Sequence, residues 1–212
     1  MKVSTPCAVI FDWGGVLMRT SSQIRRHTWD ARLGLPTGSV ERVVHGCEAW
    51  SRLQRGEIIE NAYWQAVADE LGLDAESLAR LRVDFYADDH LDEGMIALIK
   101  DLRAEGVKIG LLSNNSAALA DELTALGVSA LFDARVISGV VRVMKPEPKA
   151  YYAVLNALDI SPGRALFVDD SPVNVEGARV VGMATVLFRP DMDLRATVMD
   201  WMRALRCTGA VI

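Results

Sequence analysis

The chain has 212 residues, of which 50% are hydrophobic and 24% charged, a composition typical of a folded protein with a sizeable core and not of a disordered one. Its formal net charge is −5 and its basic residues are scattered, so we expect no nucleic-acid partner. No apolar stretch is long enough for a signal-peptide core or a membrane span, which favours a cytoplasmic protein without a membrane partner.

The three cysteines, Cys7, Cys47 and Cys207, are odd in number and far apart. They show neither the spacing of a disulfide framework nor a Cys/His pattern typical of zinc. We therefore expect inert thiols at all three positions.

Five short runs rich in Val, Ile and Leu predict the strands of a central sheet. They lack the alternation of polar and apolar residues typical of a half-exposed strand, and amphipathic stretches with helical spacing separate them. This order predicts an α/β fold with a doubly wound parallel sheet. The runs are residues 7–11, 107–113, 134–138, 165–170 and 184–188.

The long segment between the first two runs, residues 21–89, predicts helices only. Residues 59–71 carry apolar side chains at helical spacing, and Asp74 is a suitable N-cap for the helix that follows. The segment directly follows the first strand, so it should lie over that strand's carboxyl end, where open α/β sheets bind their ligands.

Three later helices have recognisable boundaries. Ser116 precedes a stretch with leucines at helical spacing, which Gly127 can end. Pro148 suits the first turn of the next helix, and Ser171 starts another that Gly182 can end. These boundaries place several polar segments in the loops between strands and helices.

The first polar segment contains Asp12, which follows the first strand and precedes Gly14 and Gly15. The glycines allow a sharp turn and a close approach of the backbone to a ligand. On its own this pattern is more typical of a turn than of a catalytic carboxylate. Its interpretation therefore depends on the other strand ends.

Two further segments offer groups that bind anions. In residues 113–116, the hydroxyl of Ser113 and the backbone N–H groups around Asn114 suit an anionic oxygen, although capping of the next helix would explain the same residues. Lys145 is followed by two nearby prolines, which stiffen the chain and fix the direction of its positive charge. Most lysines are solvated surface charges, so each segment alone has a plainer explanation, but both are compatible with a site for a phosphoryl group.

The most informative segment ends the fourth run with Asp169 and Asp170. Two neighbouring carboxylates at the end of an apolar strand repel each other unless a cation or strong donors compensate. Oxygen ligands of this kind suit Mg²⁺. The pair therefore predicts a magnesium site, which is compatible with Asp170 also capping the following helix.

The order of these residues resembles the motifs of the haloacid dehalogenase superfamily, over nearly the whole chain: Asp12, Ser113, Lys145, Asp169 and Asp170. The resemblance implies a Rossmann-like core with a central first strand. It also implies a helical cap inserted after that strand. The corresponding domains are a core of residues 1–20 and 90–212 and a cap of residues 21–89.

The resemblance further implies a Mg²⁺-dependent phosphatase that acts on a small phosphorylated molecule. Asp12 would attack phosphorus and form an aspartyl-phosphate, which water then hydrolyses. Ser113 and Lys145 would assist catalysis and, with Asn114, hold the phosphoryl oxygens. The implied metal ligands are Asp12, the carbonyl of Gly14, and Asp170, with Asp169 either a ligand or a neighbour of the ligands.

Gly14 departs from the superfamily's phosphatase pattern, which has at this position a second Asp that transfers protons. Loss of general acid catalysis typically costs about 10²- to 10⁴-fold in rate. We favour a substrate whose leaving oxygen is already acidic, such as a sugar 1-phosphate. Gly14 and residues 55–58 resemble bacterial glucose-1-phosphate phosphatases and the phosphatase domain of soluble epoxide hydrolases. The alternative is a cap histidine that acts as the acid: His27, His45 or His90.

Two other activities stay open. In a 2-haloacid dehalogenase, Asp12 would attack carbon without a metal, but Asp169 and Asp170 would place negative charge beside an anionic substrate. A degenerate binding protein is disfavoured by the complete set of motifs. The sequence indicates neither the oligomeric state nor the substrate contacts, for which the candidates are Trp13, Trp50, Trp64, Arg25, Arg26 and Arg55.

Overall fold

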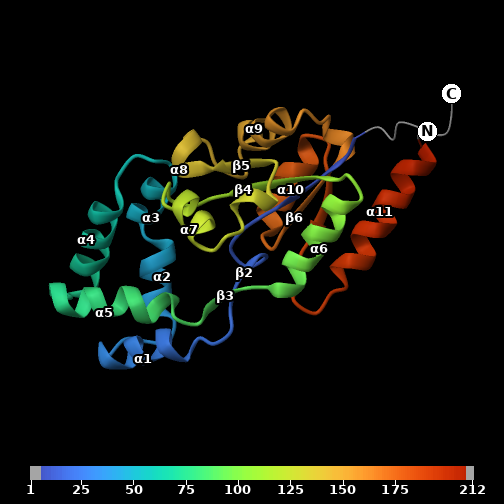
Figure 1. Ribbon diagram of the computed structural model, residues 1–212. Helices are drawn as coiled ribbons and strands as arrows, with labels where there is room; N and C mark the ends of the chain where they lie inside the picture. Colours follow the sequence, from blue (N-terminus) through green and yellow to red (C-terminus); the bar gives the residue numbers. More distant parts are fainter. Residues whose placement is uncertain (1–5, 209–212) are drawn as a thin grey trace.

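The five predicted runs form one parallel sheet in the computed structural model, which describes residues 6–208 (Figure 1). The strands are β1 (Ala8–Phe11), β4 (Lys108–Ser113), β5 (Ala134–Ile137), β6 (Ala165–Asp169) and β7 (Ala184–Leu187). Their order is β5-β4-β1-β6-β7, so the first strand of the chain lies at the centre. This confirms the predicted α/β fold with a Rossmann-like core.

Helices cover both faces of the sheet, and alternate residues of β1 face opposite layers. Val9 and Phe11 pack into one apolar core, and Ala8 and Ile10 pack into the other. Strands buried on both faces have no polar side, which is why apolar runs without alternation predicted them correctly. The first layer holds α6 (Glu93–Ala104), α7 (Leu119–Ala125) and α11 (Leu194–Thr208), and the second holds α9 (Pro148–Leu158) and α10 (Pro172–Val180).

Two of the three predicted helix starts in the core are confirmed. Pro148 opens α9, and Ser171 is the residue before α10. The start at Ser116 is wrong, because residues 114–118 form a loop and a turn before α7 begins at Leu119. The Ser116 hydroxyl donates to Glu60 at 3.3 Å and therefore does not cap a helix. Short elements that the sequence analysis missed are α8 (Ser138–Val141) and the 3-10 turns Ser129–Leu131 and Pro162–Arg164.

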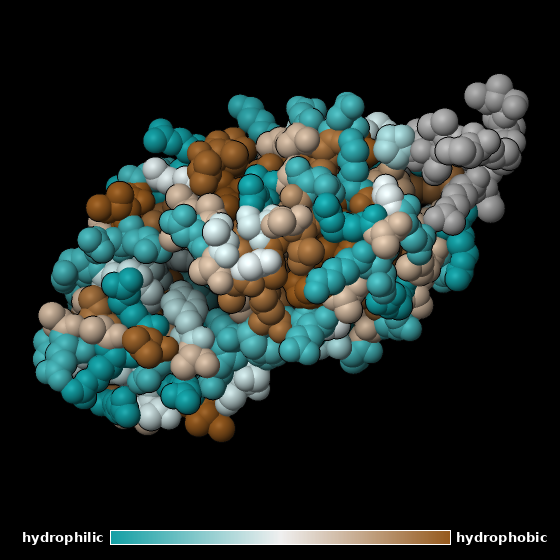
Figure 2. Space-filling model, viewed as in Figure 1, coloured by the Kyte–Doolittle hydropathy of each residue, from teal (hydrophilic) through white to brown (hydrophobic). Residues whose placement is uncertain are grey.

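Residues 24–86 form five helices with an apolar core of their own, hereafter the helical unit (Figure 1). Asp74 caps one of them as predicted, since its carboxylate accepts the N–H of Ser77 at 2.8 Å. Figure 2 shows mostly hydrophilic side chains on the outer surface of this unit, because its apolar residues face inward. The helices are α1 (Ile24–Arg32), α2 (Ser39–Gly46), α3 (Glu48–Gln54), α4 (Glu60–Leu71) and α5 (Ala75–Tyr86).

A two-stranded antiparallel ribbon joins the helical unit to the sheet. It pairs β2 (Met18–Thr20) with β3 (Asp89–Leu91), so the chain leaves and returns at the same place. The sequence analysis missed both strands, because three partly exposed residues are too few to show a period. We propose that this ribbon separates core from cap; the division at residues 21–89 stays a prediction.

None of the helices within residues 6–208 is long and apolar enough to cross a membrane. Cys7 and Cys47 are both partly buried. Cys207, the third predicted inert thiol, lies outside the residues whose side chains the structure describes.

Candidate active site

Three carboxylates meet at the carboxyl ends of the neighbouring strands β1 and β6. Asp12 directly follows β1, Asp169 is the last residue of β6, and Asp170 comes next. One carboxylate oxygen from each side chain lies within 4.8 Å of the others. The pairing of β1 with β6 therefore brings together the residues that the sequence analysis assigned to the nucleophile and the metal.

The side chain of Lys145 lies between two of these carboxylates and is 1% exposed. Its Nζ is 2.8 Å from Oδ1 of Asp12 and 2.6 Å from Oδ2 of Asp169. Asn114, which follows β4, fixes the lysine backbone: its Oδ1 accepts the Lys145 N–H and its Nδ2 donates to the Lys145 carbonyl, each at 2.8 Å. The positive charge is thus held in one direction by a residue at the end of another strand.

Asp169 is fully buried, and both of its oxygens are engaged. Besides Lys145, Oδ1 accepts the backbone N–H of Ser171 at 2.8 Å, and Nδ2 of Asn174 donates to Oδ1 and Oδ2 at 3.1 and 3.2 Å. These bonds occupy the carboxylate with nitrogen donors. Asp169 therefore orients Lys145 and the start of α10, and it is less suited than Asp12 or Asp170 to ligate a metal directly.

Burial dominates the electrostatics of Asp12, whose side chain is 12% exposed. Desolvation raises the pKa of this carboxyl from 3.8 to about 7; the nearby Lys145 opposes the rise and Asp169 adds to it. Burial also raises the pKa of Asp170, again with a contribution from Asp169. Both carboxyl groups would ionise more readily beside a further positive charge.

The donor set fits a hard divalent cation. Oδ1 of Asp12 pairs with Lys145 and accepts the N–H of Trp13 at 2.7 Å, whereas Oδ2 takes part in neither contact. A Cβ added at Gly15 would lie only 2.1 Å from Oδ2 of Asp170, so this glycine admits Asp170 to the site. Carboxylate oxygens backed by water and a carbonyl group suit Mg²⁺. Asp12 and Asp170 would hold the ion, with the carbonyl of Gly14 as the predicted third protein ligand.

The predicted phosphoryl pocket is only partly available. Ser113, at the end of β4, lines the cavity beside Asp12 and Lys145. The Asn114 side chain is committed to Lys145, and the next two amides are also used: Asn115 N–H donates to Ser138 at 3.0 Å and Ser116 N–H to the Asn115 side chain at 2.7 Å. The Ser113 hydroxyl, the Asn114 backbone N–H and the Lys145 ammonium are therefore the groups of the predicted pocket left for a phosphoryl oxygen.

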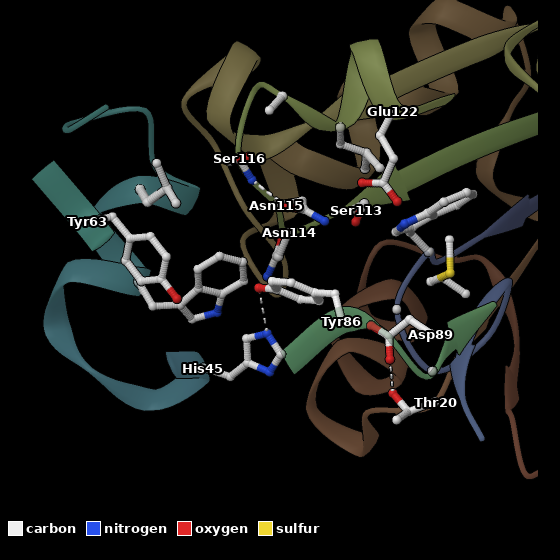
Figure 3. A pocket seen from close by; sticks show the side chains of 18 of the residues that line it. Thr20, His45, Tyr63, Tyr86, Asp89, Ser113, Asn114, Asn115, Ser116 and Glu122 are labelled. Atoms are coloured by element: carbon white, nitrogen blue, oxygen red, sulfur yellow. Dashed lines mark hydrogen bonds between the residues drawn. The ribbon is translucent and has the colours of Figure 1, made fainter. Parts of the chain in front are cut away.

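A cavity of about 1170 Å³ extends from Asp12 into the helical unit. In Figure 3, His45, Tyr63 and Tyr86 project from the helical unit, while Ser113 and Ser116 line the opposite side of the cavity. Three contacts join the two sides. Gln54 donates to the Asn114 carbonyl at 2.8 Å, Ser116 donates to Glu60 at 3.3 Å, and Arg55 pairs with Glu147 at 2.7 Å.

The candidate substrate contacts divide clearly. All three tryptophans proposed from the sequence, Trp13, Trp50 and Trp64, line the cavity. His45 is the one candidate histidine that lines it, whereas His27 and His90 are exposed elsewhere.

The candidate arginines are largely committed to ion pairs. Arg26 lines the cavity but is buried against Glu41 at 2.6 Å and Asp89 at 3.0 Å. Arg25 pairs with Asp88, and Arg55 pairs with Glu147. None of the three presents an unpaired guanidinium for a second phosphate group.

Several cavity residues escaped the sequence analysis. Tyr63 and Tyr86 follow helical spacing, which predicts packing, and Glu60 and Glu122 resemble solvated helix charges. Asn174 carried a usable signal, because a polar side chain in the first turn after Asp169 and Asp170 points back toward the strand end. The others required the folded chain to reveal them.

A family model described as haloacid dehalogenase-like hydrolase matches residues 8–182. The chain belongs to the haloacid dehalogenase-like hydrolase family. This confirms the family resemblance that Asp12, Ser113, Lys145 and Asp170 carry. It does not test the resemblance to glucose-1-phosphate phosphatases.

Relatives of this hydrolase include two curated proteins that match nearly end to end. Phosphatase MT3486 of Mycobacterium tuberculosis (strain CDC 1551 / Oshkosh) is 30% identical over 97% of this chain and 96% of its own length. Sesquiterpene phosphatase astK of Aspergillus oryzae is 27% identical over 94% of this chain and 97% of its own length.

A solved structure shows the same fold. It is that of the haloacid dehalogenase family enzyme BT-2542 from Bacteroides thetaiotaomicron, in complex with magnesium and inorganic phosphate. Its TM-score is 0.73 at 20% identity, over 89% of this chain and 97% of that one.

Replacement of Gly15 by alanine should weaken Mg²⁺ binding in this hydrolase, whereas replacement of Gly14 should not. A Cβ at Gly14 meets nothing within 4 Å, whereas Gly15 has φ +75° and a Cβ there would collide with Asp170. We expect Gly15→Ala to weaken Mg²⁺ affinity by about tenfold or more, and Gly14→Ala to retain it. Mg²⁺ titration of the melting temperature measures both. Equal affinities in the two variants would contradict this account of Gly15.

The effect of Mg²⁺ on stability should increase with pH. A carboxyl whose pKa is raised by folding, as for Asp12 at about 7, stabilises the fold at low pH and loses that contribution as the pH rises through 7. Mg²⁺ binds the ionised form and would offset this loss, so the rise in melting temperature with Mg²⁺ should be larger near pH 8 than near pH 5. Calorimetry at both values measures it, with Asp12→Asn as the control. A rise that is the same at both values would argue against this linkage.

Proposed function

We propose that the protein is a Mg²⁺-dependent phosphatase that hydrolyses a small-molecule phosphate monoester. The observation that carries the proposal is Lys145, whose buried ammonium lies 2.8 Å from Asp12 at the end of a cavity that Ser113 also lines. A carboxylate nucleophile beside a fixed positive charge and a hydroxyl donor is suited to phosphoryl transfer. The phosphatase names of the two relatives, and the magnesium and phosphate bound to the BT-2542 enzyme, support the same activity.

In the proposed reaction, an oxygen of Asp12 attacks phosphorus as the bond from phosphorus to the leaving oxygen breaks. The product of this step is an aspartyl-phosphate and the free alcohol, whose oxygen takes up a proton. Lys145 and Ser113 hold the phosphoryl oxygens during the transfer. Water then attacks phosphorus, which releases phosphate and restores the Asp12 carboxylate.

Mg²⁺ would neutralise charge on the phosphoryl group and on the acidic residues around it. Asp12 and Asp170 are the proposed direct ligands, with the Gly14 carbonyl as the third. Asp169 would act through Lys145, because its two oxygens already accept hydrogen bonds from nitrogen donors.

The two other activities are less well supported. A 2-haloacid dehalogenase would bring an anionic substrate beside Asp169 and Asp170, where burial and the neighbouring Asp169 already raise the pKa of Asp170. A degenerate binding protein would not need a buried lysine held against its nucleophile. Phosphate hydrolysis uses every charged group at the site.

The first test is phosphate release from a panel of phosphate esters, with Mg²⁺ and with a chelator. We expect activity that requires Mg²⁺ and falls by about 10³-fold or more in Asp12→Asn, because an amide cannot form the covalent intermediate. Glu105→Gln, an exposed change away from the cavity, is the matched control. Chloride release from chloroacetate in the presence of chelator would overturn the proposal in favour of a dehalogenase.

Proton delivery to the leaving oxygen is the role that Gly14 leaves empty, and we propose Glu122 of α7 for it. The Glu122 carboxyl lines the cavity, as does Trp13, the residue that follows the proposed nucleophile. Figure 3 shows it directed into the cavity on the same side as Ser113. Desolvation and the nearby Asp89 raise the pKa of this carboxyl, with a smaller contribution from Glu60 and an opposing one from Trp13; the net rise favours the protonated form that an acid catalyst needs.

Two variants test the proton donor. Glu122→Gln should lower turnover of an alkyl phosphate relative to p-nitrophenyl phosphate by about 10²-fold, because nitrophenolate leaves without a proton. Gly14→Asp, combined with Glu122→Gln, should restore that ratio, since a Cβ at residue 14 meets nothing within 4 Å. The measurement is kcat for both esters across pH, with Asp121→Asn on the same helix as the control. An unchanged ratio in Glu122→Gln would exclude Glu122 as the acid.

The identity of the leaving alcohol depends on the lining of the cavity. Gly14 favours a sugar 1-phosphate if no acid replaces the missing carboxylate, and the relative astK is named for a sesquiterpene substrate. With Glu122 as the acid, an ordinary alcohol becomes an adequate leaving group.

A further inference from the structure

Five aromatic rings of the helical unit form a closed circuit on the wall of the cavity. They come from four helices, α2 to α5, and all five residues line the cavity. Neighbouring ring centroids are 4.9 to 6.3 Å apart, within the range of favourable aromatic pairs. In order around the circuit, hereafter the aromatic cluster, they are His45, Trp50, Tyr63, Trp64 and Tyr86.

The polar side-chain atoms of three members of the aromatic cluster, His45, Tyr63 and Tyr86, are already bonded to the protein. The Tyr63 hydroxyl donates to the Val44 carbonyl at 2.7 Å. The two nitrogens of His45 contact Glu41 at 2.9 Å and the Tyr86 hydroxyl at 3.4 Å (Figure 3). The aromatic cluster therefore offers a ligand mainly carbon surface. Such a surface suits a hydrocarbon better than a polyhydroxylated sugar, which needs hydrogen-bond partners.

The two ends of the cavity differ, although charged residues line both: Glu41, Glu60 and Arg82 belong to the helical unit. Asp12, Ser113 and Lys145 stand at the sheet end, whereas Leu53, Ala79 and Val83 join the aromatic cluster at the helical end. A volume of about 1170 Å³ also exceeds what a phosphoryl group and one sugar need, because typical ligand pockets span roughly 300 to 1000 Å³. The other aliphatic side chains that line the cavity come from β2 and from α7 with its flanking residues: Met18, Ala118, Leu119 and Leu126.

The charges around the aromatic cluster argue against a cationic ligand. The guanidinium of Arg82 already lies over Trp64, 5.1 Å from the ring centroid, and would repel a second cation. The negative charge of Glu41 is paired with Arg26 at 2.6 Å and with His45 at 2.9 Å. These charges disfavour a cationic group at the aromatic end of the cavity.

We propose that the substrate is the monophosphate ester of an uncharged, mainly hydrocarbon alcohol, and that the aromatic cluster binds its hydrocarbon part. This inference rests on the proposed phosphatase function and names its substrate class. The phosphate group would lie between Asp12, Ser113 and Lys145, and the hydrocarbon chain would extend toward Trp50 and Tyr86. Affinity should then grow with the length of the chain, because each buried methylene group adds apolar contact.

Binding is measured without turnover, by quenching of tryptophan fluorescence in Asp12→Asn with Mg²⁺ present. The probes are n-butyl phosphate and n-octyl phosphate, which share the phosphate and the primary alkyl ester. Full burial of one methylene group is worth roughly a three- to fourfold change in affinity, so we expect octyl phosphate to bind at least about tenfold more tightly. Glucose 1-phosphate and phosphocholine, probes for a sugar and a cation, should bind no better than butyl phosphate.

Variants locate the effect. Trp50→Ala and Tyr86→Ala, each combined with Asp12→Asn, should reduce the octyl-to-butyl affinity ratio to about threefold or less. Should Trp50→Ala fail to fold, Tyr86→Ala still tests the inference, because Tyr86 is 38% exposed and the fold depends less on it. Tyr152→Ala, which removes an exposed aromatic residue of α9 outside the cavity, should keep the full ratio.

Equal affinities for the two alkyl phosphates, or tighter binding of glucose 1-phosphate or phosphocholine, would overturn the inference. An octyl-to-butyl affinity ratio that is unchanged in both Trp50→Ala and Tyr86→Ala would also overturn it, since it would place the alkyl chain elsewhere. A native protein that binds octyl phosphate with this chain-length dependence but releases no phosphate would contradict the proposed phosphatase activity alone. The two claims therefore fail separately.

Discussion

The site depends on one buried ammonium group placed between two buried carboxylates. Lys145, in the loop between α8 and α9, lies 2.8 Å from Asp12, which follows β1, and 2.6 Å from Asp169, which ends β6. Removal of the lysine would leave two carboxylates uncompensated in a low-dielectric environment, which is strongly unfavourable. Even with the lysine present, burial raises the pKa of Asp12 to about 7, so the site retains a demand for further positive charge that a divalent cation is suited to meet.

The position of the helical unit is connected to this charge cluster through Asn114. The Asn114 side chain holds the backbone of Lys145 at both its N–H and its carbonyl, while the Asn114 carbonyl accepts a hydrogen bond from Gln54 of α3. A movement of the helical unit that broke the Gln54 contact would act on the residue that orients the lysine. The same loop reaches Glu60 through Ser116, so the closed cavity and the ordered site share their supports.

The cavity combines a charged end, made by the sheet, with an aromatic end, made by the inserted helices. Gly14 removes one proton donor from the charged end, and Glu122 supplies a carboxyl from α7 in the same space. The proposals on Glu122 and on the aromatic cluster are consistent with each other. Hydrocarbon alcohols have a high pKa, and an acid catalyst allows such an alcohol to leave. A sugar 1-phosphate would have needed that help least.

The sequence by itself determined the sheet, the helical insert and the residues at the strand ends, because runs buried on both faces and polar residues that follow them leave local patterns. It placed Asp12, Ser113, Lys145 and Asp170 at one edge from the rule that parallel strands share a carboxyl end. It was wrong about the helix start at Ser116 and missed the ribbon of β2 and β3. Only the tertiary structure decided that Asp169 is occupied by Lys145 and Asn174, that His45 rather than His27 or His90 reaches the cavity, and that five aromatic residues from four helices face one space. Those features depend on contacts between residues distant in the chain, and helical spacing alone does not distinguish a ring that packs in a core from one that faces a ligand.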